Sequence, residues 1–156
     1  MFLTKFSCGE WKSSKKRRIL WRSRKKKESW KINLINLKTK EIIEISHNLN
    51  VIEYGQGGLL DILFKNNTVW VSYTENRGNY KTTTSIAKGI FDKERIQFEN
   101  IFQAYPAIDS PYHFGSRLAI KNDYLFASVG ERGQGMIAQD ATKHPGSIIT
   151  VSYTHL

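Results

Sequence analysis

From residue 31 onward the chain alternates between short apolar stretches and residues that favour tight turns, a pattern typical of antiparallel β structure. The stretch 59–64 leads into 68–73 across Asn66-Asn67, and 31–37 leads into 41–45 across three polar residues. Asparagine tolerates the positive φ angles that tight hairpin turns require. No part of the chain shows convincing helical periodicity of any length. The sequence therefore predicts a series of hairpins and an all-β fold.

A later hairpin repeats an earlier one at a constant offset. Residues 117–120 lead into 124–129 across Asn122-Asp123, and the segment 121–128 aligns with 65–72 at an offset of 56 residues. Repeats of this size with several strands per unit are typical of β-propeller blades. A propeller ring needs at least roughly four blades. The chain of 156 residues is therefore expected to be an incomplete propeller fragment of about two to three blades.

The net charge of +10 comes from one N-terminal segment. Residues 1–31 hold twelve Lys or Arg and two Glu, so the rest of the chain is neutral. We expect residues 1–30 to form a basic segment that is disordered or not native to the protein, because such dense like charges repel one another. An arm that binds phosphate backbones or anionic lipid is the alternative. The segment lacks the apolar core of a signal peptide.

Composition excludes several classes of protein. The neutral body does not interleave basic and aromatic residues as nucleic-acid-binding β surfaces do, so no nucleic-acid partner is expected. No apolar run approaches the roughly 18 residues of a membrane-spanning helix. The single cysteine, Cys8, excludes an internal disulfide framework and a metal site built from several thiolates.

Three glycine-containing segments are unusual for plain blade structure. Gly55–Leu60 places three glycines directly before a predicted strand, which suits either a tight turn or a close approach to a ligand. His113 lies just before a strand and beside Phe114-Gly115, where it is either a structural or exposed residue or a base that acts near neutral pH. The loop 129–135 carries Glu131-Arg132, a possible solvated pair, and its spacing does not fit a phosphate-binding loop.

In their order along the chain, these segments resemble a known family. The motifs are Gly-Gln-Gly-Gly-Leu-Leu-Asp from residue 55, His-Phe-Gly-Ser-Arg-Leu-Ala from 113, Val-Gly-Glu-Arg-Gly from 129, and Ala-Gln-Asp and His-Pro-Gly-Ser-Ile-Ile from 138 and 144. They resemble the soluble aldose sugar dehydrogenases of the glucose/sorbosone dehydrogenase family over roughly residues 30–149. The resemblance implies a six-bladed β-propeller quinoprotein with pyrroloquinoline quinone (PQQ) and calcium, in the periplasm.

The resemblance also implies roles for individual residues. His113 matches the general base that removes the proton of the sugar's anomeric hydroxyl while a hydride passes to PQQ, and the quinone passes its electrons to an external acceptor. Gln56 matches a polar residue that lines the site, and Arg132 matches a side chain that borders the sugar pocket. Tyr112 stands where some members carry an acid, which leaves carboxylate support for the base in doubt. His144 reads as a structural loop residue.

The resemblance implies that the residues binding the cofactor and the metal lie outside this chain. The groups that clamp PQQ and the calcium ligands are expected beyond residue 156. Residues 31–150 are expected to form the partial propeller domain, and residues 151–156 to form a tail that departs from the family pattern. The resulting prediction is an aldose-oxidising oxidoreductase whose present chain is inactive. The alternative is a non-catalytic propeller that binds carbohydrate or protein, since one fold hosts many functions.

Overall fold

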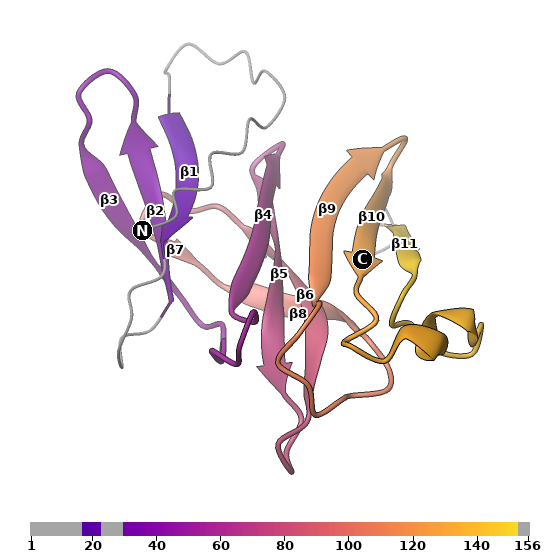
Figure 1. Ribbon diagram of the computed structural model, residues 1–156. Coiled ribbons are helices and arrows are strands. Elements are labelled where there is room, and N and C mark those ends of the chain that lie inside the picture. The colour runs from indigo at the N-terminus through magenta and orange to yellow at the C-terminus, as the bar shows by residue number, and fades with distance from the viewer. Residues whose placement is uncertain (1–16, 23–29, 153–156) are drawn as a thin grey trace.

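The computed structural model describes residues 17–22 and 30–152. These residues form three β-sheets that stand side by side (Figure 1). The helical element of the described part is a short 3₁₀ helix, η1 (Gly135–Gln139). No described helix is long and apolar enough to cross a membrane. The predicted all-β fold is confirmed.

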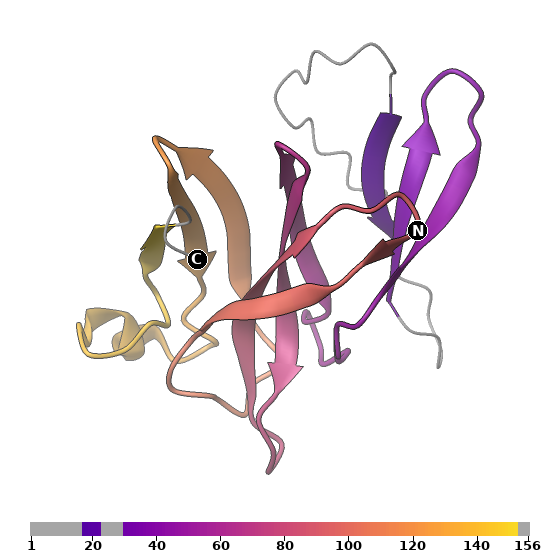
Figure 2. The ribbon, with the colours of Figure 1, turned by 180° about the vertical axis from the view of Figure 1, so that it is seen from behind.

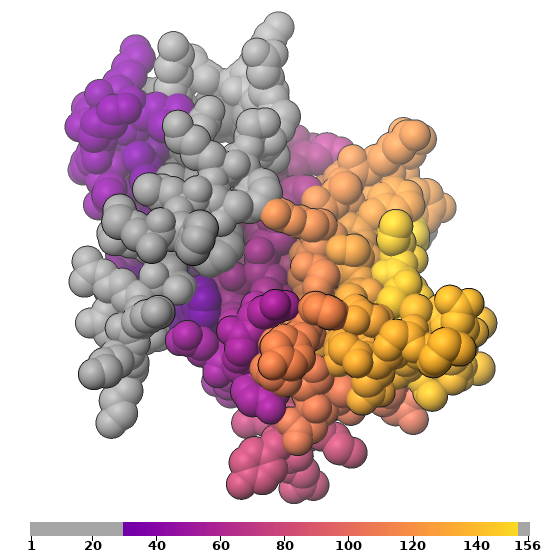
Figure 3. Space-filling view, in the orientation of Figure 1, coloured from indigo at the N-terminus to yellow at the C-terminus, as the bar shows by residue number. Residues whose placement is uncertain are grey.

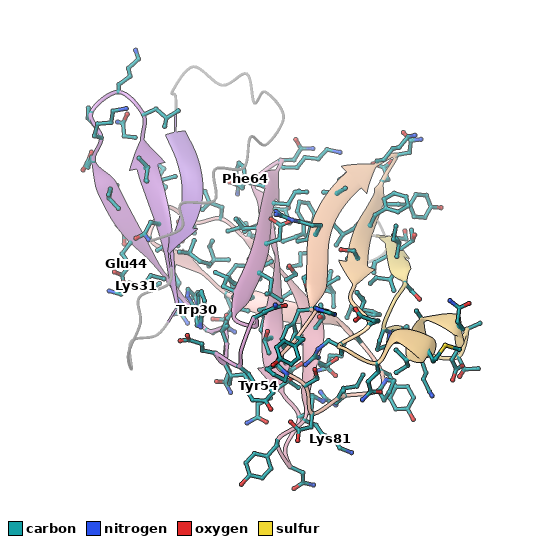
Figure 4. The ribbon with its side chains drawn as sticks, viewed as in Figure 1. Trp30, Lys31, Glu44, Tyr54, Phe64 and Lys81 are labelled. Atoms are coloured by element: carbon teal, nitrogen blue, oxygen red, sulfur yellow. The ribbon has the colours of Figure 1, made fainter. Side chains whose placement is uncertain are left out.

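The first sheet has the strand order β1-β2-β3-β7. Its strands are β1 (Arg17–Arg22), β2 (Lys31–Asn36), β3 (Ile42–His47) and β7 (Arg95–Ile96). The predicted hairpin between β2 and β3 is present, with Leu34 opposite Ile43, and an ion pair of 2.7 Å joins Lys31 to Glu44 across it (Figure 4). Strand β1 comes from the basic N-terminal segment and pairs with β2. The other residues of that segment before residue 30 lie outside the described residues.

The second sheet has the order β4-β5-β6-β8. Its strands are β4 (Leu59–Lys65), β5 (Thr68–Asn76), β6 (Thr82–Ile90) and β8 (Phe98–Gln103). Asn66 and Asn67 form the turn between β4 and β5 with φ angles of 49° and 64°, as the sequence predicts. Seen from behind (Figure 2), the segment that carries β7 and β8 runs from the first sheet to the second and ties the two together.

The third sheet has three strands in the order β11-β10-β9. They are β9 (Gly115–Lys121), β10 (Tyr124–Val129) and β11 (Ile148–Ser152). Asn122 and Asp123 turn the chain with φ angles of 47° and 63°. Both ends of β9 and the start of β10 fall 56 residues after those of β4 and β5, so the repeat in the sequence is a repeat of whole strands. Residues 151 and 152 of the predicted tail belong to β11, and residues 153–156 lie outside the described residues.

Strand β5 divides the apolar core into two layers. Its alternate side chains point to opposite faces of the second sheet. Val69, Val71 and Tyr73 pack toward the first sheet, whereas Trp70 packs with Leu125 of the third sheet. The second sheet thus packs its two faces against the first and the third sheet, in the manner of adjacent propeller blades.

The inner strands of the second and third sheets are neighbours. The amide of Leu118 in β9 donates to the Asp61 carboxylate of β4 at 2.9 Å. In Figure 1, β4 and β9 both begin, and β10 ends, at the lower end of the sheets. The loops before β4, before β9 and after β10 therefore gather at one end of the molecule.

Candidate active site

Three loops from different parts of the sequence are joined by backbone hydrogen bonds. The Gln56 amide donates to the Pro111 carbonyl at 2.8 Å, and the Gly130 amide donates to the Phe114 carbonyl at 3.0 Å. The loop that carries His113 therefore lies between the other two. In Figure 3, purple, orange and gold atoms from these parts of the chain meet on the lower part of the visible face.

The structure brings Gln56 and His113 together. The backbone amide of His113 donates to Gln56 Oε1 at 2.9 Å. His113 has a φ angle of 48°, in the left-handed region that few residues other than glycine adopt. Such backbone conformations persist where the surroundings fix them, and they gather at functional sites. Gln56 is one of the groups that hold the backbone of His113 in this conformation.

Glu131 is the direct partner of the His113 ring. His113 Nδ1 and Glu131 Oε1 form a short hydrogen bond, and the Gly133 amide donates to the same carboxylate oxygen at 3.1 Å. The side chain of His113 is 55% exposed and that of Glu131 is 28% exposed, so the pair lies at the surface of the loop cluster. Sequence reasoning treated Glu131 as a possible solvated residue and looked for carboxylate support at position 112.

The charge of Glu131 determines which nitrogen of the neutral His113 ring carries the proton. The hydrogen bond from His113 holds the pKa of Glu131 below its usual value, so Glu131 is a carboxylate near neutral pH. An ionised carboxylate only accepts hydrogen bonds, and His113 Nδ1 must therefore be the donor. With the proton of a neutral ring on Nδ1, the lone pair for taking up a proton is on Nε2. The exposed ring is thus arranged as a base.

Glycine at position 130 permits the close approach of the loops. A Cβ atom there would overlap with the carbonyl oxygen of His113. Because no other residue lacks a Cβ, a larger side chain would push the His113 loop away from the end of β10. The glycine of the Val-Gly-Glu-Arg-Gly motif is therefore required by the packing against His113.

Buried hydroxyl groups of β5 and β6 hold the same loops against the second sheet. Thr84 Oγ1 donates to the Phe114 carbonyl at 3.1 Å, and Ser72 Oγ donates to the Ser116 carbonyl at 2.6 Å. Thr74 Oγ1 accepts from the Gly58 amide at 2.8 Å. Loop carbonyls and amides that would otherwise be buried without partners are satisfied in this way. The second sheet is thus the rigid base on which the His113 and Gln56 loops rest.

Arg132 lies within this cluster, but its side chain points inward. The residue is 2% exposed, and its guanidinium hydrogen-bonds to Tyr112, Thr82 and Ser110. Burial lowers the pKa of Arg132 to about 10, so the group remains charged at neutral pH. The structure brings Arg132 close to the His113 loop but does not present its guanidinium at the surface.

Three further residues of the loops have different surroundings. His144 Nδ1 accepts from the Tyr105 amide at 2.8 Å, and the ring stacks edge-on against Phe102, which is the arrangement of a structural loop residue. Tyr112 is 55% exposed beside His113. Tyr54, at the lower end of the molecule in Figure 4, donates to Asp109 at 2.7 Å, and this hydrogen bond raises the pKa of Tyr54.

Comparison with known proteins identifies the family. The sequence profile described as Glucose / Sorbosone dehydrogenase matches residues 17–154. The chain belongs to this family. The match is wider than the domain range of 31–150 expected from the sequence, and it includes β1 and β11. No curated protein sequence matches the chain.

Solved structures of the family share the fold. A crystal structure of a glucose dehydrogenase is 26% identical with a TM-score of 0.73, and the match covers 85% of this chain and 43% of that one. The soluble aldose sugar dehydrogenase of Escherichia coli in its apo form is 27% identical with a TM-score of 0.73, covering 78% of this chain and 38% of that one. The chain therefore corresponds to part of a glucose dehydrogenase propeller and spans less than half the length of these relatives.

The family resemblance implies calcium and PQQ, and the described residues supply no cluster of acidic, histidine or cysteine side chains for the metal. Among residues 17–22 and 30–152, no group of three or more His, Cys, Asp or Glu side chains could hold a metal ion. The cation of the cluster, Arg132, is enclosed by its own hydrogen bonds and does not offer its charge to a carboxylated cofactor. The hollow beside η1, lined by Gln134, Met136 and Asp140 among others, includes none of the predicted site residues.

Proposed function

We propose that this segment supplies the general base of a PQQ-dependent aldose dehydrogenase. The observation that carries the proposal is the contact of His113 Nδ1 with the Glu131 carboxylate, which assigns the acceptor lone pair to Nε2. The ring is exposed at the end of the sheets where the loops gather, and membership of the glucose/sorbosone dehydrogenase family supports a sugar as the substrate.

In the proposed reaction the anomeric carbon of the aldose is oxidised to a lactone. The O–H proton of the anomeric hydroxyl passes to His113 Nε2, and the C–H bond of the same carbon gives up its electron pair as a hydride. When bound, PQQ would supply the hydride acceptor, and the hydride together with the proton later released from His113 Nε2 accounts for the two hydrogens of the quinol. Removal of the proton during hydride loss avoids a high-energy cation at oxygen, which is why a positioned base accelerates this chemistry. Glu131 stabilises the imidazolium that forms.

The other predicted site residues differ in how far the geometry supports them. Gln56 Oε1 accepts a hydrogen bond from the His113 amide. A contact between Gln56 and the sugar would therefore use the side-chain Nε2 of Gln56, which is a donor. A sugar contact by Arg132 stays a prediction, and the burial of its guanidinium does not support it.

Replacement of His113 tests the proposal. In an enzyme that carries these residues within a complete propeller, His113→Ala should lower sugar-dependent dye reduction by about 10²–10⁴-fold, the usual contribution of a positioned base. Binding of PQQ should persist, because the resemblance places the groups that clamp PQQ outside this chain. The measurement is steady-state kinetics with added PQQ and Ca²⁺.

His144→Ala is the matched control. It removes a histidine that hydrogen-bonds to loop backbone, so it should lower thermal stability and leave turnover of the folded enzyme near normal. Near-normal turnover in His113→Ala would overturn the proposal. If the complete protein binds sugar without any turnover, it is a non-catalytic propeller. The 156-residue chain alone should show no turnover in the same assay, since it spans under half the length of solved relatives.

The proposal extends to the partners and the compartment. The substrate is an aldose, and the reduced quinone passes its electrons to an external acceptor. The family resemblance supports a periplasmic location. Cell fractionation of a host that produces the complete protein checks this, with activity expected in the periplasmic fraction and not in the cytosol.

A further inference from the structure

The guanidinium of Arg132 is surrounded by neutral groups. Its Nε donates to the Tyr112 carbonyl at 3.0 Å, and Nη1 donates to the Thr82 carbonyl at 3.1 Å. Nη2 donates to Thr82 Oγ1 at 2.7 Å and also to the Ser110 carbonyl. These bonds use four of the five N–H groups of the side chain. The plane of the guanidinium lies over the Phe114 ring, with Cζ 3.7 Å from the ring centroid.

This set of partners is unusual for a buried cation. Buried charges are normally paired with an opposite charge. Within the described part of the chain, no carboxylate forms an ion pair with Arg132. Carbonyl oxygens and an aromatic face stabilise the charge instead. A side chain held at such a cost of desolvation is expected to have a specific structural task.

The partners of Arg132 are the residues on either side of His113. Tyr112 precedes His113 and Phe114 follows it, and the guanidinium contacts both. At its other end, Arg132 is the chain neighbour of Glu131, and its backbone amide donates to the His113 carbonyl at 3.3 Å. One side chain therefore fastens the segment of the base to the segment of its carboxylate partner, and fixes both against Thr82 at the start of β6.

We propose that Arg132 is a positioning residue that aligns His113 with Glu131. The inference rests on the proposed function and gives Arg132 a role different from the sugar contact predicted from the sequence. The rigid, planar fork of Arg suits the task because its donors diverge toward several acceptors, whereas the ammonium group of Lys is a single point. Loss of the fork should let the two loops separate, although neither His113 nor Glu131 is changed.

Arg132→Lys in the complete enzyme tests the alignment by kinetics. Misplacement of a catalytic group by about 1 Å can cost on the order of 10²-fold, so kcat should fall by about 10- to 100-fold. The KM for the sugar should stay within about twofold, because no contact with the sugar is lost. Thr82→Val removes one acceptor and leaves Arg132 in place, and it should lower kcat in the same direction by a smaller factor.

A double-mutant cycle separates positioning from a general effect on stability. If Arg132 acts through the pair, Glu131→Gln should lower kcat far less in the Arg132→Lys background than in the wild type. Arg95→Lys is the matched control: Arg95 is an exposed residue of β7 that hydrogen-bonds to Gln97, far along the chain from the site, and its replacement should not change kcat. Additive effects of the Arg132 and Glu131 substitutions would overturn the inference.

Hydrogen exchange provides a readout that does not depend on turnover. In the protein without sugar or cofactor, Arg132→Lys should speed exchange in peptides covering residues 110–114 and 130–133. The expected factor is about tenfold or more, as for loss of a hydrogen bond to a charged group. Unchanged exchange, or a raised KM with normal kcat, would overturn the inference and favour a sugar contact. Normal turnover in His113→Ala would instead overturn the proposed function while leaving the exchange result intact.

Discussion

At the scale of single residues, the His113–Glu131 pair links stability to pH. The hydrogen bond from His113 lowers the pKa of Glu131 in the folded chain, whereas an unfolded glutamate titrates near about 4.3. A carboxylate with a lowered folded pKa stabilises the fold above its unfolded pKa. That stabilisation is lost as the pH falls through the folded pKa. Because the pair is partly exposed, solvent screens it and the effect on stability is small.

Glu131→Gln should therefore destabilise the chain in a pH-dependent way. The difference in unfolding midpoint from the wild type should be constant above about pH 5 and should shrink as the pH falls through about 4 and below. Urea unfolding between pH 3 and 7 measures it. Glu53→Gln, at an exposed carboxylate, is the control and should not show this profile. A difference that grows toward low pH would contradict the sign of the assignment.

The sequence proposed His113 and Gln56 as site residues, and the structure brings the two together. The sequence did not indicate that Glu131 contacts the His113 ring or that the Arg132 side chain points inward. The glycines around His113 and the family motifs indicated the loop. Glu131 pairs with His113 only because β10 returns beside β9 and ends at the same loop, a relation between strands that the local sequence does not contain. The inward direction of the Arg132 side chain depends on its left-handed backbone, with φ of 60°, and no local pattern predicts it.

At the scale of elements, the hairpin turns depend on residues that tolerate left-handed backbone. Asn67 has φ of 64° between β4 and β5. Asn67→Val should destabilise the chain by about 1–2 kcal/mol, because a Cβ in this region meets its own backbone and a β-branched side chain is the worst case. Asn67→Gly removes the same side chain without that strain and should be near neutral. Urea unfolding of both variants checks the difference, and equal destabilisation by the two would contradict the explanation.

Strand positions were predictable because two local signals coincide. Turn residues at 66–67 and 122–123 mark the ends of strands, and the offset of 56 residues repeats them. The strand β1 was not predicted, because its short apolar stretch Ile19-Leu20-Trp21 lies between clusters of Lys and Arg. Its pairing with β2 is a tertiary relation that outweighs the charge pattern of the segment.

At the scale of the whole molecule, the described sheets form an open arc of blades. Propellers protect their sheet faces and edges by closing a ring. Here strand β11 is the edge of the third sheet, and Ile148 on it is 74% exposed. An exposed apolar edge strand is a template for pairing with other chains. The 156-residue chain by itself should therefore self-associate at micromolar concentration.

Substitutions at two adjacent residues of β11 distinguish self-association through the edge strand from association that follows unfolding. Ile148 is exposed, whereas Ile149 packs against the core between the second and third sheets, because successive side chains of a strand point to opposite faces. Ile148→Lys should lower self-association, measured by light scattering, and leave the urea midpoint nearly unchanged, since charge on an edge strand blocks pairing. Ile149→Lys should instead destabilise the chain by about 1–2 kcal/mol, because this side chain is partly buried and its burial is lost, and the unfolded chain should associate more. If the Ile148→Lys variant scattered light as strongly as the wild type, association would use another surface of the molecule.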